Sequence, residues 1–238
     1  MNQESQIAFL SLGTSADNVT IGCAKMIDEA DKIYCFGSHG KSHCADIIGD
    51  ITSLDKVEVI DIPMSKNRTQ VMAVYESLAS HIANEHGKGM KIAVATEGDT
   101  GLFATTHYVM DKLTERGIPC RQHAGVPAFI EAAAIAGLHL AKLNERLIVI
   151  PGTTTAEELA QLVNNGTNVV IMKLSMATDA VHRCICAHPE FQYHYFRNIG
   201  MESQEHISDT TILRDLDFPY FSLMIIAAHT TKGAKFMN

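Results

Sequence analysis

The stretch of sequence that decides the fold is Ile92–Tyr108, IAVATEGDTGLFATTHY. It begins with a short apolar run that suits a buried parallel strand. An acidic glycine turn, Glu97–Gly101, then breaks the pattern, and apolar residues resume at helical spacing from Leu102 to Leu113. A strand that ends in a glycine turn and leads into a helix presents main-chain N–H groups at the carboxyl edge of a sheet. Open α/β folds bind their ligands at that edge.

Strand and helix patterns continue on both sides of this stretch. Strands are expected at Ile7–Leu12, Lys32–Phe36, Val57–Ile62, Leu147–Ile150, Asn168–Lys173 and Tyr220–Ala228. Helices are expected from about Val19 to Ala30 and over Asn67–Glu85, Phe129–Ala141 and Glu157–Val163. This alternation predicts an α/β fold with parallel strands and right-handed crossovers. A break near Gln122–Val126 predicts two domains, residues 1–122 and 123–238.

The composition restricts the class of protein. The chain has 238 residues, of which 46% are hydrophobic and 19% charged, which is typical of a folded protein. A formal net charge of -8, with no run of Lys and Arg, disfavours nucleic acid as a partner. The polar start MNQESQ has no basic region that would mark a signal peptide, and no apolar run could span a bilayer. Six cysteines without disulfide spacing are expected to be reduced thiols, so we expect a cytoplasmic protein.

Two groups of histidines raise the question of a metal site. His39 and His43 are four residues apart, and His182, Cys184, Cys186 and His188 alternate as they would on one face of a strand. Their spacing matches no standard zinc motif, and parallel side chains on a strand form a tetrahedron poorly. We therefore expect that no metal is required.

Several stretches taken together resemble the tetrapyrrole methylase family over nearly the whole chain. Within that family, the chain is similar to the branch that methylates C-20 of precorrin-2 in corrin biosynthesis. The strand, Gly98-Asp99 turn and helix carry this resemblance, as do four further segments: Ile60–Glu97, Ala124–Leu140, Ile148–Lys173 and Tyr220–Leu223.

This resemblance implies two α/β domains of the tetrapyrrole methylase type, an active site in the cleft between them, and a homodimer. It implies a methyltransferase that uses S-adenosylmethionine as methyl donor and a tetrapyrrole, either precorrin-2 or its cobalt-loaded form, as substrate. The donor contacts carried over by matching motif are Gly98, Asp99, Leu102, Thr105, Pro127, Ala128, Met172 and Gly200. The expected substrate contacts are Gly13, Asp17, Lys66 and Arg68, the last two as cations for the carboxylates of a tetrapyrrole.

Three ligand-facing loops depart from the family pattern. The first loop, Gly13–Asp17, is shorter than the family's glycine- and proline-rich turn. Thr100 stands where the family usually has a proline, and Pro127 and Ala128 stand where it has two small hydroxyl residues. These changes leave open a relative that binds a tetrapyrrole or the donor without C-20 methylation. A relative that methylates ribosomal RNA or another target that is not a tetrapyrrole is also open, although the acidic net charge disfavours it.

Methyl transfer from a sulfonium requires no pair of catalytic side chains. The protein mainly aligns the donor and the nucleophile and excludes water. A base must later remove a proton from the methylated carbon, and the sequence alone does not identify that base.

Overall fold

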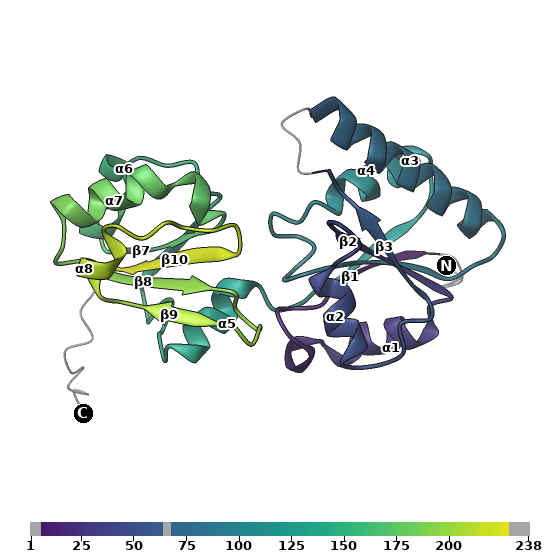
Figure 1. The fold of residues 1–238 in the computed structure, drawn as a ribbon, viewed down its shortest axis with the longest axis horizontal. Coiled ribbons are helices and arrows are strands. Elements are labelled where there is room, and N and C mark those ends of the chain that lie inside the picture. The colour runs from purple at the N-terminus through teal and green to yellow at the C-terminus, as the bar shows by residue number, and fades with distance from the viewer. Residues whose placement is uncertain (1–5, 64–67, 229–238) are drawn as a thin grey trace. The chain divides into compact units, whose positions relative to one another are not determined.

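The computed structural model describes residues 6–63 and 68–228. The chain divides into two compact units, Met1–Ala128 and Phe129–Asn238. They run from purple to teal and from teal to yellow in Figure 1. Each unit has its own sheet and its own hydrophobic core.

The first unit contains a five-stranded sheet in the order β3-β2-β4-β1-β5, and every strand pair in it is parallel. Its strands are β1 (Ile7–Ser11), β2 (Lys32–Gly37), β3 (Val57–Asp61), β4 (Ile92–Thr96) and β5 (Cys120–His123). Its helices are η1 (Ala16–Asn18), α1 (Ile21–Glu29), α2 (His43–Gly49), α3 (Arg68–Gly87) and α4 (His107–Glu115).

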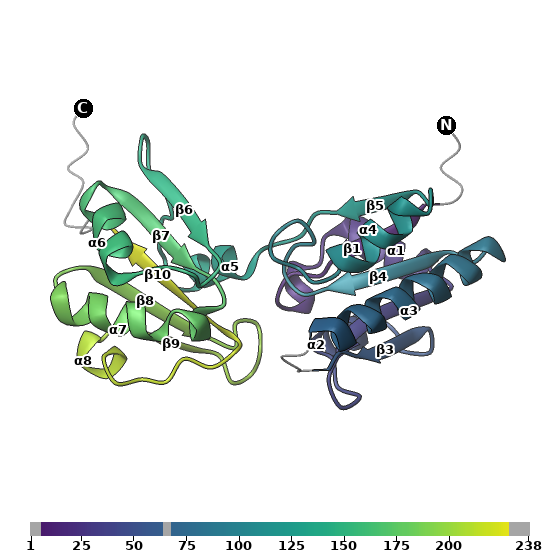
Figure 2. The same ribbon diagram turned by 90° about the horizontal axis from the view of Figure 1, so that it is seen from above.

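Helices cover both faces of this first sheet. One face packs against α1 and α2 around a core that includes Leu10, Ile33 and Ala93. The other face packs against α3 and α4 around a second core that includes Phe9 and Val94. Figure 2 shows α3 and α4 side by side over the sheet. The central strands β1, β2 and β4 are buried on both faces over most of their length, so their sequences are almost continuously apolar.

The second unit contains a mixed sheet in the order β6-β7-β10-β8-β9. Strands β6 and β7 are parallel, whereas β10 is antiparallel to both of its neighbours. The strands are β6 (Arg146–Ile150), β7 (Thr167–Ile171), β8 (Gln192–Arg197), β9 (Glu205–Ile207) and β10 (Ser222–Ala227). The helices are α5 (Ala128–Ile135), α6 (Ala156–Asn164), η2 (Leu174–Met176), α7 (Thr178–Ala187) and α8 (Thr210–Leu213), with α6 and α7 together on one face of the sheet (Figure 1).

Two helices start or end differently from the sequence expectation. The helix expected from Leu102 begins only at His107, so residues 98–106 form a loop. The helix expected to reach Ala141 ends at Ile135. It ends there because Gly137 adopts a φ of +63° and its N–H donates to the Ala134 carbonyl, while Leu138 N–H donates to the Ala133 carbonyl. This pair of bonds closes a helix at a left-handed glycine.

The segment with alternating His and Cys lies on helix α7, so these side chains do not share one face of a strand. The buried side chains of α7 are Ala180, Val181, Cys184 and Ile185. Their spacing is helical, and it places them on the face that packs into the core of the second unit.

No helix in the described part of the chain is both long enough and apolar enough to cross a membrane.

Candidate functional site

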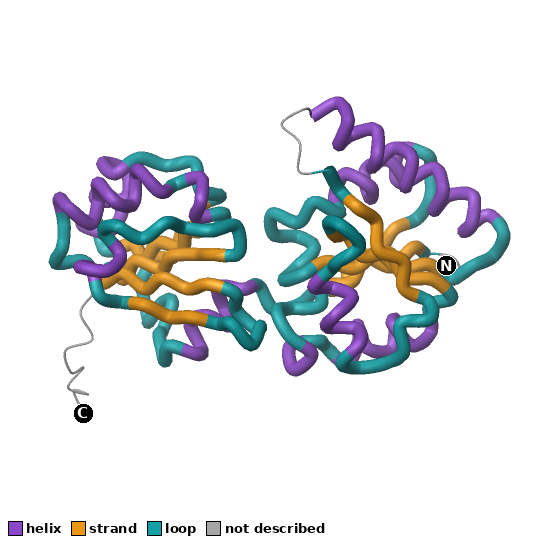
Figure 3. Tube along the Cα trace, viewed as in Figure 1, coloured by secondary structure: helices purple, strands orange, loops and turns teal. Residues whose placement is uncertain are grey.

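The chain leaves the first sheet in opposite directions after β1 and after β4. Strand β1 leads to α1 on one face, and its neighbour β4 leads to α4 on the other face. Two adjacent parallel strands whose connections diverge in this way form a topological switch point, and ligands bind in the crevice outside their carboxyl ends. The loops concerned are drawn teal in Figure 3.

The loops after β1 and β4 are joined through two glycines. Gly13 N–H donates to the Gly98 carbonyl at 3.1 Å, and Gly98 N–H donates to the Gly13 carbonyl at 2.7 Å. Gly13 has a φ of +68°, and a Cβ there would lie 2.4 Å from Cβ of Asn18. Only glycine fits that position, so the first loop folds back closely over the end of its own strand.

Asp99 holds three chain segments together. One carboxylate oxygen accepts from Gly101 N–H at 2.8 Å within its own turn. The other accepts from Gly125 N–H at 2.8 Å, in the loop after β5, and lies 3.5 Å from the Ser11 hydroxyl at the end of β1. The Asp99 side chain therefore fixes the relative positions of the three loops at the carboxyl edge. We call these contacts of Asp99 with Ser11, Gly101 and Gly125 the Asp99 clamp.

Thr100 makes a contact that a proline could not make. Its N–H donates to the buried Ser11 hydroxyl at 2.8 Å, and its own hydroxyl lies 3.2 Å from the same oxygen. A proline at this position would have no N–H to donate. The departure from the family pattern at Thr100 is thus matched by the serine at the end of β1.

The structure brings several of the expected donor contacts together. A Cβ at Gly98 would lie 3.9 Å from Cα of Pro127 and 4.0 Å from the nitrogen of Ala128, so these three residues adjoin. Leu102 N–H donates to the Asp99 carbonyl at 3.1 Å, so Leu102 lies directly beside the turn that holds the Asp99 clamp. Thr105 is exposed further along the same loop.

Three buried polar atoms near the switch point have no hydrogen-bond partner in the described part of the chain. They are Oγ1 of Thr14 and Oδ1 of Asn18, both in the first loop, and Oγ1 of Thr106 just before α4. An unpaired buried polar atom costs about 1–3 kcal/mol, so such atoms are uncommon unless another molecule completes them. Their position fits a polar ligand.

Glu97 was not among the site residues expected from the sequence, and His43 was considered there only as a metal ligand. Glu97 directly follows β4, and its pKa is raised above the usual value by burial, against the effect of His43. His43 opens α2, with Nε2 3.1 Å from the Thr14 carbonyl oxygen. The signal was present in the strand, because Ala93, Ala95 and Glu97 alternate onto the face that α2 covers.

The expected substrate contacts are more scattered. Arg68 is the exposed first residue of α3, and its guanidinium donates to the Tyr108 hydroxyl at 2.9 Å. Asp17 is exposed in η1, after Gly13. Lys66 lies outside the described residues.

The second unit carries the remaining two expected donor contacts. Met172 directly follows β7, and its N–H donates to the Ile150 carbonyl at 2.8 Å. Gly200 follows β8, with a φ of +82° and its N–H donating to the side-chain oxygen of Gln204 at 3.0 Å. Strands β7 and β8 are both antiparallel to β10, so the two residues lie at the same edge of the second sheet.

The histidine groups are engaged in local contacts. The ring of His182 lies 3.0 Å from the Leu216 carbonyl oxygen, and that of His188 lies 3.1 Å from the Glu190 carboxylate. Within residues 6–63 and 68–228, no three His, Cys, Asp or Glu side chains are grouped so as to hold a metal ion.

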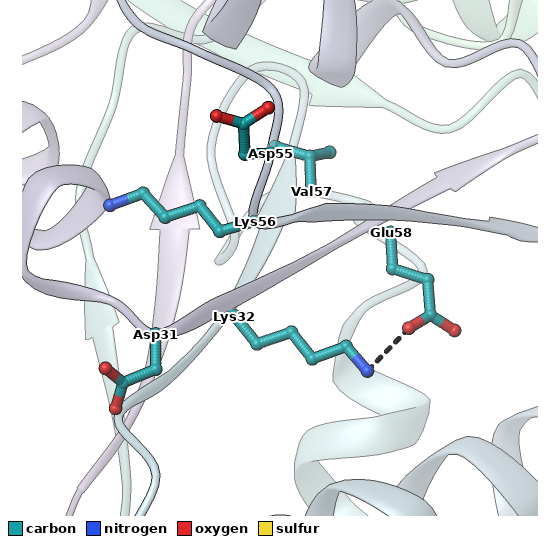
Figure 4. A pocket seen from close by; sticks show the side chains of 6 residues that line it. All are labelled: Asp31, Lys32, Asp55, Lys56, Val57 and Glu58. Carbon is teal, nitrogen blue, oxygen red and sulfur yellow. Dashed lines mark ion pairs between the residues drawn. The ribbon is translucent and has the colours of Figure 1, made fainter.

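A depression of about 300 Å³ lies at the opposite, amino edge of the first sheet. Lys32 inside it forms an ion pair with Glu58 at 2.7 Å, drawn as a dashed line in Figure 4, and another with Glu85 at 3.2 Å. Its cation is already neutralised and it is remote from the switch point, so we do not place the functional site there. The lining residues are Asp31, Lys32, Asp55, Lys56, Val57 and Glu58.

Comparison with known sequences gives one family and several relatives. Residues 6–214 match the family described as Tetrapyrrole (Corrin/Porphyrin) Methylases. A precorrin-2 C(20)-methyltransferase from a Sinorhizobium species is 23% identical over 220 residues, which cover 87% of this chain and 89% of that protein. A cobalt-precorrin-2 C(20)-methyltransferase from Salmonella typhimurium is 28% identical over 171 residues, which cover 69% of this chain and 71% of the relative.

Comparison with solved structures supports the same fold. A cobalt precorrin-4 methyltransferase superimposes with a TM-score of 0.73 at 14% identity, covering 93% of this chain and 94% of that one. A precorrin-6Y methylase from Archaeoglobus fulgidus superimposes with a TM-score of 0.61 at 14% identity, covering 94% and 98%.

Proposed function

We propose that this chain, which belongs to the tetrapyrrole (corrin/porphyrin) methylase family, transfers a methyl group from S-adenosylmethionine to a bridging carbon of a reduced tetrapyrrole. The proposed position is C-20 of precorrin-2 or cobalt-precorrin-2. The names of the relatives from Sinorhizobium and Salmonella support this choice.

The observation that carries the proposal is the arrangement at the switch point of the first sheet. The Asp99 clamp fixes three loops there, beside buried polar atoms of Thr14, Asn18 and Thr106 that lack partners. A nucleoside with its ribose hydroxyls and amino acid tail has the polar groups to complete such atoms.

The proposed donor contacts are main-chain or small side-chain groups. Gly98, Asp99, Leu102, Thr105, Pro127 and Ala128 line the loops of the first unit, and Met172 and Gly200 are the proposed contacts from the second. The sulfonium supplies the activated methyl group. The contribution of the protein is alignment, which for well-oriented reactants is worth roughly 7–11 kcal/mol.

The proposed substrate contacts supply charge and shape. Arg68, with the proposed help of Lys66, provides positive charge for tetrapyrrole carboxylates. The Arg68 guanidinium is oriented by Tyr108, since it bonds the hydroxyl and lies 5.8 Å from the ring centre. Gly13 and Asp17 are proposed to border the ring from the first loop.

We also propose a cytoplasmic homodimer. The homodimer follows from the family resemblance. The cytoplasmic location agrees with the six cysteines, all of which are free thiols. The mass of the protein in solution, measured by light scattering after gel filtration, tests the assembly. A monomer at micromolar concentration would contradict it.

The proposed reaction is tested by incubating the protein with S-adenosylmethionine and either precorrin-2 or cobalt-precorrin-2. We expect the tetrapyrrole to gain the mass of one methyl group in one of the two reactions. Calorimetry with the donor alone separates the alternatives. Donor or tetrapyrrole binding without any mass gain would favour a non-catalytic relative, and no binding of either would exclude both.

A further inference from the structure

We propose that Glu97 is the proton acceptor of this methyl transfer, and that His43, which opens α2, acts on it electrostatically. The inference rests on the proposed function. It names the base that the reaction requires once the bridging carbon has been methylated.

The position of Glu97 follows from the geometry of β4. Side chains alternate along the strand, and Ala93 and Ala95 lie in the core under α1 and α2. Glu97 is next in this series, one residue beyond the end of the strand and one residue before Gly98. Its carboxylate is thus directed to the α2 side of the switch point, where the first loop and α2 meet.

The surroundings of Glu97 consist of the first turn of α2 and the first loop. From α2, His43 and Asp46 interact electrostatically with the carboxyl, and the buried Cys44 thiol lies near it. From the first loop, Thr14 binds the His43 ring through its carbonyl oxygen, while its own buried hydroxyl has no partner in the described part of the chain. A carboxyl group, a histidine and a residue with an unpaired hydroxyl therefore neighbour one another where α2 meets the first loop.

The other carboxylates at this edge are weaker candidates for the base, because they accept hydrogen bonds from main-chain N–H groups or are exposed to solvent. Asp99 accepts from two main-chain N–H groups. Asp61 accepts from Gly40 N–H at 2.8 Å, and Asp17 is exposed. By contrast, no hydrogen bond or ion pair to the Glu97 carboxylate occurs within residues 6–63 and 68–228, although the side chain is mostly buried.

Burial makes the Glu97 carboxylate a stronger base. It raises the pKa of Glu97; the neighbouring His43 moderates that rise, and Asp46 adds to it. A carboxylate with a raised pKa is a stronger base, and general bases work best when their pKa lies near the working pH.

In the proposed reaction Glu97 acts after the new carbon–carbon bond has formed. The bridging carbon attacks the methyl group, a carbon–carbon bond forms, the carbon–sulfur bond breaks, and its electron pair remains on sulfur. The carbon then holds both the methyl group and its original hydrogen, and the ring system carries a positive charge. Glu97 accepts that hydrogen as a proton, the C–H electron pair returns to the ring, and Glu97 later releases the proton to water.

The test compares Glu97→Gln with the wild type and with Glu115→Gln, a matched change of an exposed carboxylate on α4. We expect Glu97→Gln to lower turnover by on the order of 10²- to 10⁴-fold. Calorimetric donor binding and the thermal midpoint should stay near the wild-type values. We expect Glu115→Gln to keep wild-type turnover.

A second variant tests the role of His43 through the pH profile. Wild-type turnover should rise with pH through the pKa of Glu97, because only the carboxylate accepts a proton. In His43→Gln the electrostatic effect of His43 on Glu97 is absent, so this rise should move to higher pH.

The outcomes separate the inference from the proposed function. Wild-type turnover and an unchanged pH profile in Glu97→Gln would overturn the inference and leave the proposed function intact. A wild-type protein that methylates neither substrate would overturn both. If Glu97→Gln does not fold, the His43→Gln profile decides: a shift to higher pH supports the inference, and an unchanged profile contradicts it.

Discussion

At the scale of single residues, the carboxyl edge of the first sheet depends on side chains that bond main-chain groups far away in sequence. Asp99 reaches Gly125, and Ser11 reaches Thr100. The Asp99 carboxylate is therefore a structural clamp whether or not it also contacts the donor. If an Asp99 variant loses donor binding, its stability has to be measured as well, because the loss could come from disordered loops and not from a lost donor contact.

The contact between Ser11 and Thr100 gives a direct prediction. Thr100→Pro restores the residue that the family usually has, but it removes the N–H that the buried Ser11 hydroxyl accepts from. We expect a loss of roughly 1–3 kcal/mol in the free energy of unfolding, measured by urea denaturation. Thr100→Ser keeps the N–H and a hydroxyl, and it serves as the control. Equal stability of the proline and serine variants would show that the hydrogen bond from Thr100 N–H to the Ser11 hydroxyl does not stabilise the protein.

At the scale of elements, the loop after β5 packs against the ends of β1 and β4. A Cβ at Gly125 would lie 2.5 Å from Cβ of Ser11 and 2.7 Å from the carbonyl oxygen of Gly98. These neighbours are backbone or close to it, so they move only at a cost. The loop is thereby held at the position from which Pro127 and Ala128 reach Gly98.

We expect Gly125→Ala to destabilise the protein by about 1–3 kcal/mol or more through overpacking. The control is Gly87→Ala at the end of α3, where an added Cβ meets nothing within 4 Å. That control should be neutral or slightly stabilising, because alanine favours a helix over glycine. Thermal unfolding of the two variants side by side checks the prediction, and a harmless Gly125→Ala would refute it.

The edge formed by β8 and β9 carries a pH-dependent pair. His194 Nδ1 lies 3.2 Å from His206 Nε2, and burial, with the neighbouring His206, lowers the pKa of His194 to about 4. The unfolded chain binds the proton from about pH 6.5 downwards. The unfolded state therefore holds more protons than the folded state between about pH 6.5 and 4, and stability falls as the pH falls through that window.

His194→Gln should flatten this fall. The effect is at most about 3 kcal/mol, and less because the ring remains partly exposed. Urea denaturation at a series of pH values measures it, with His139→Gln, an exposed histidine, as the comparison. If both variants lose stability on acidification as steeply as the wild type, His194 is not the group responsible.

The sequence predicted elements where the evidence is local. Apolar periodicity located the strands β1, β2, β3 and β4, since a buried strand has to be apolar. It failed where long-range contacts decide, as in the loop before His107, which is shaped by Asp99, Ser11 and Gly125. No element was predicted at helix α7, although Val181, Cys184 and Ile185 have helical spacing, because the stretch after Lys173 shows no clear apolar periodicity over its whole length.

The candidate site, like the fold, could be predicted from the sequence only in part. The family resemblance selected Gly98 and Asp99, which lie at the switch point. It could not select Glu97 and His43, because their proximity arises from the packing of α2 against β4 and not from a motif.

At the scale of the whole molecule, the family assignment and the fold rest on different evidence that agrees. The family matches residues 6–214, and methyltransferases of corrin biosynthesis share the fold at 14% identity. Low identity with a retained fold is expected when the scaffold is kept and the loops change. The substrate therefore has to be decided by chemistry and not by similarity.

The most direct measurement is the fate of a carbon-13-labelled methyl group on S-adenosylmethionine, followed by NMR of the tetrapyrrole after reaction with precorrin-2 or cobalt-precorrin-2. We predict that the label appears as a methyl group on the C-20 bridging carbon of one of the two products. A label that stays on the donor, or that appears at another ring position, would contradict it.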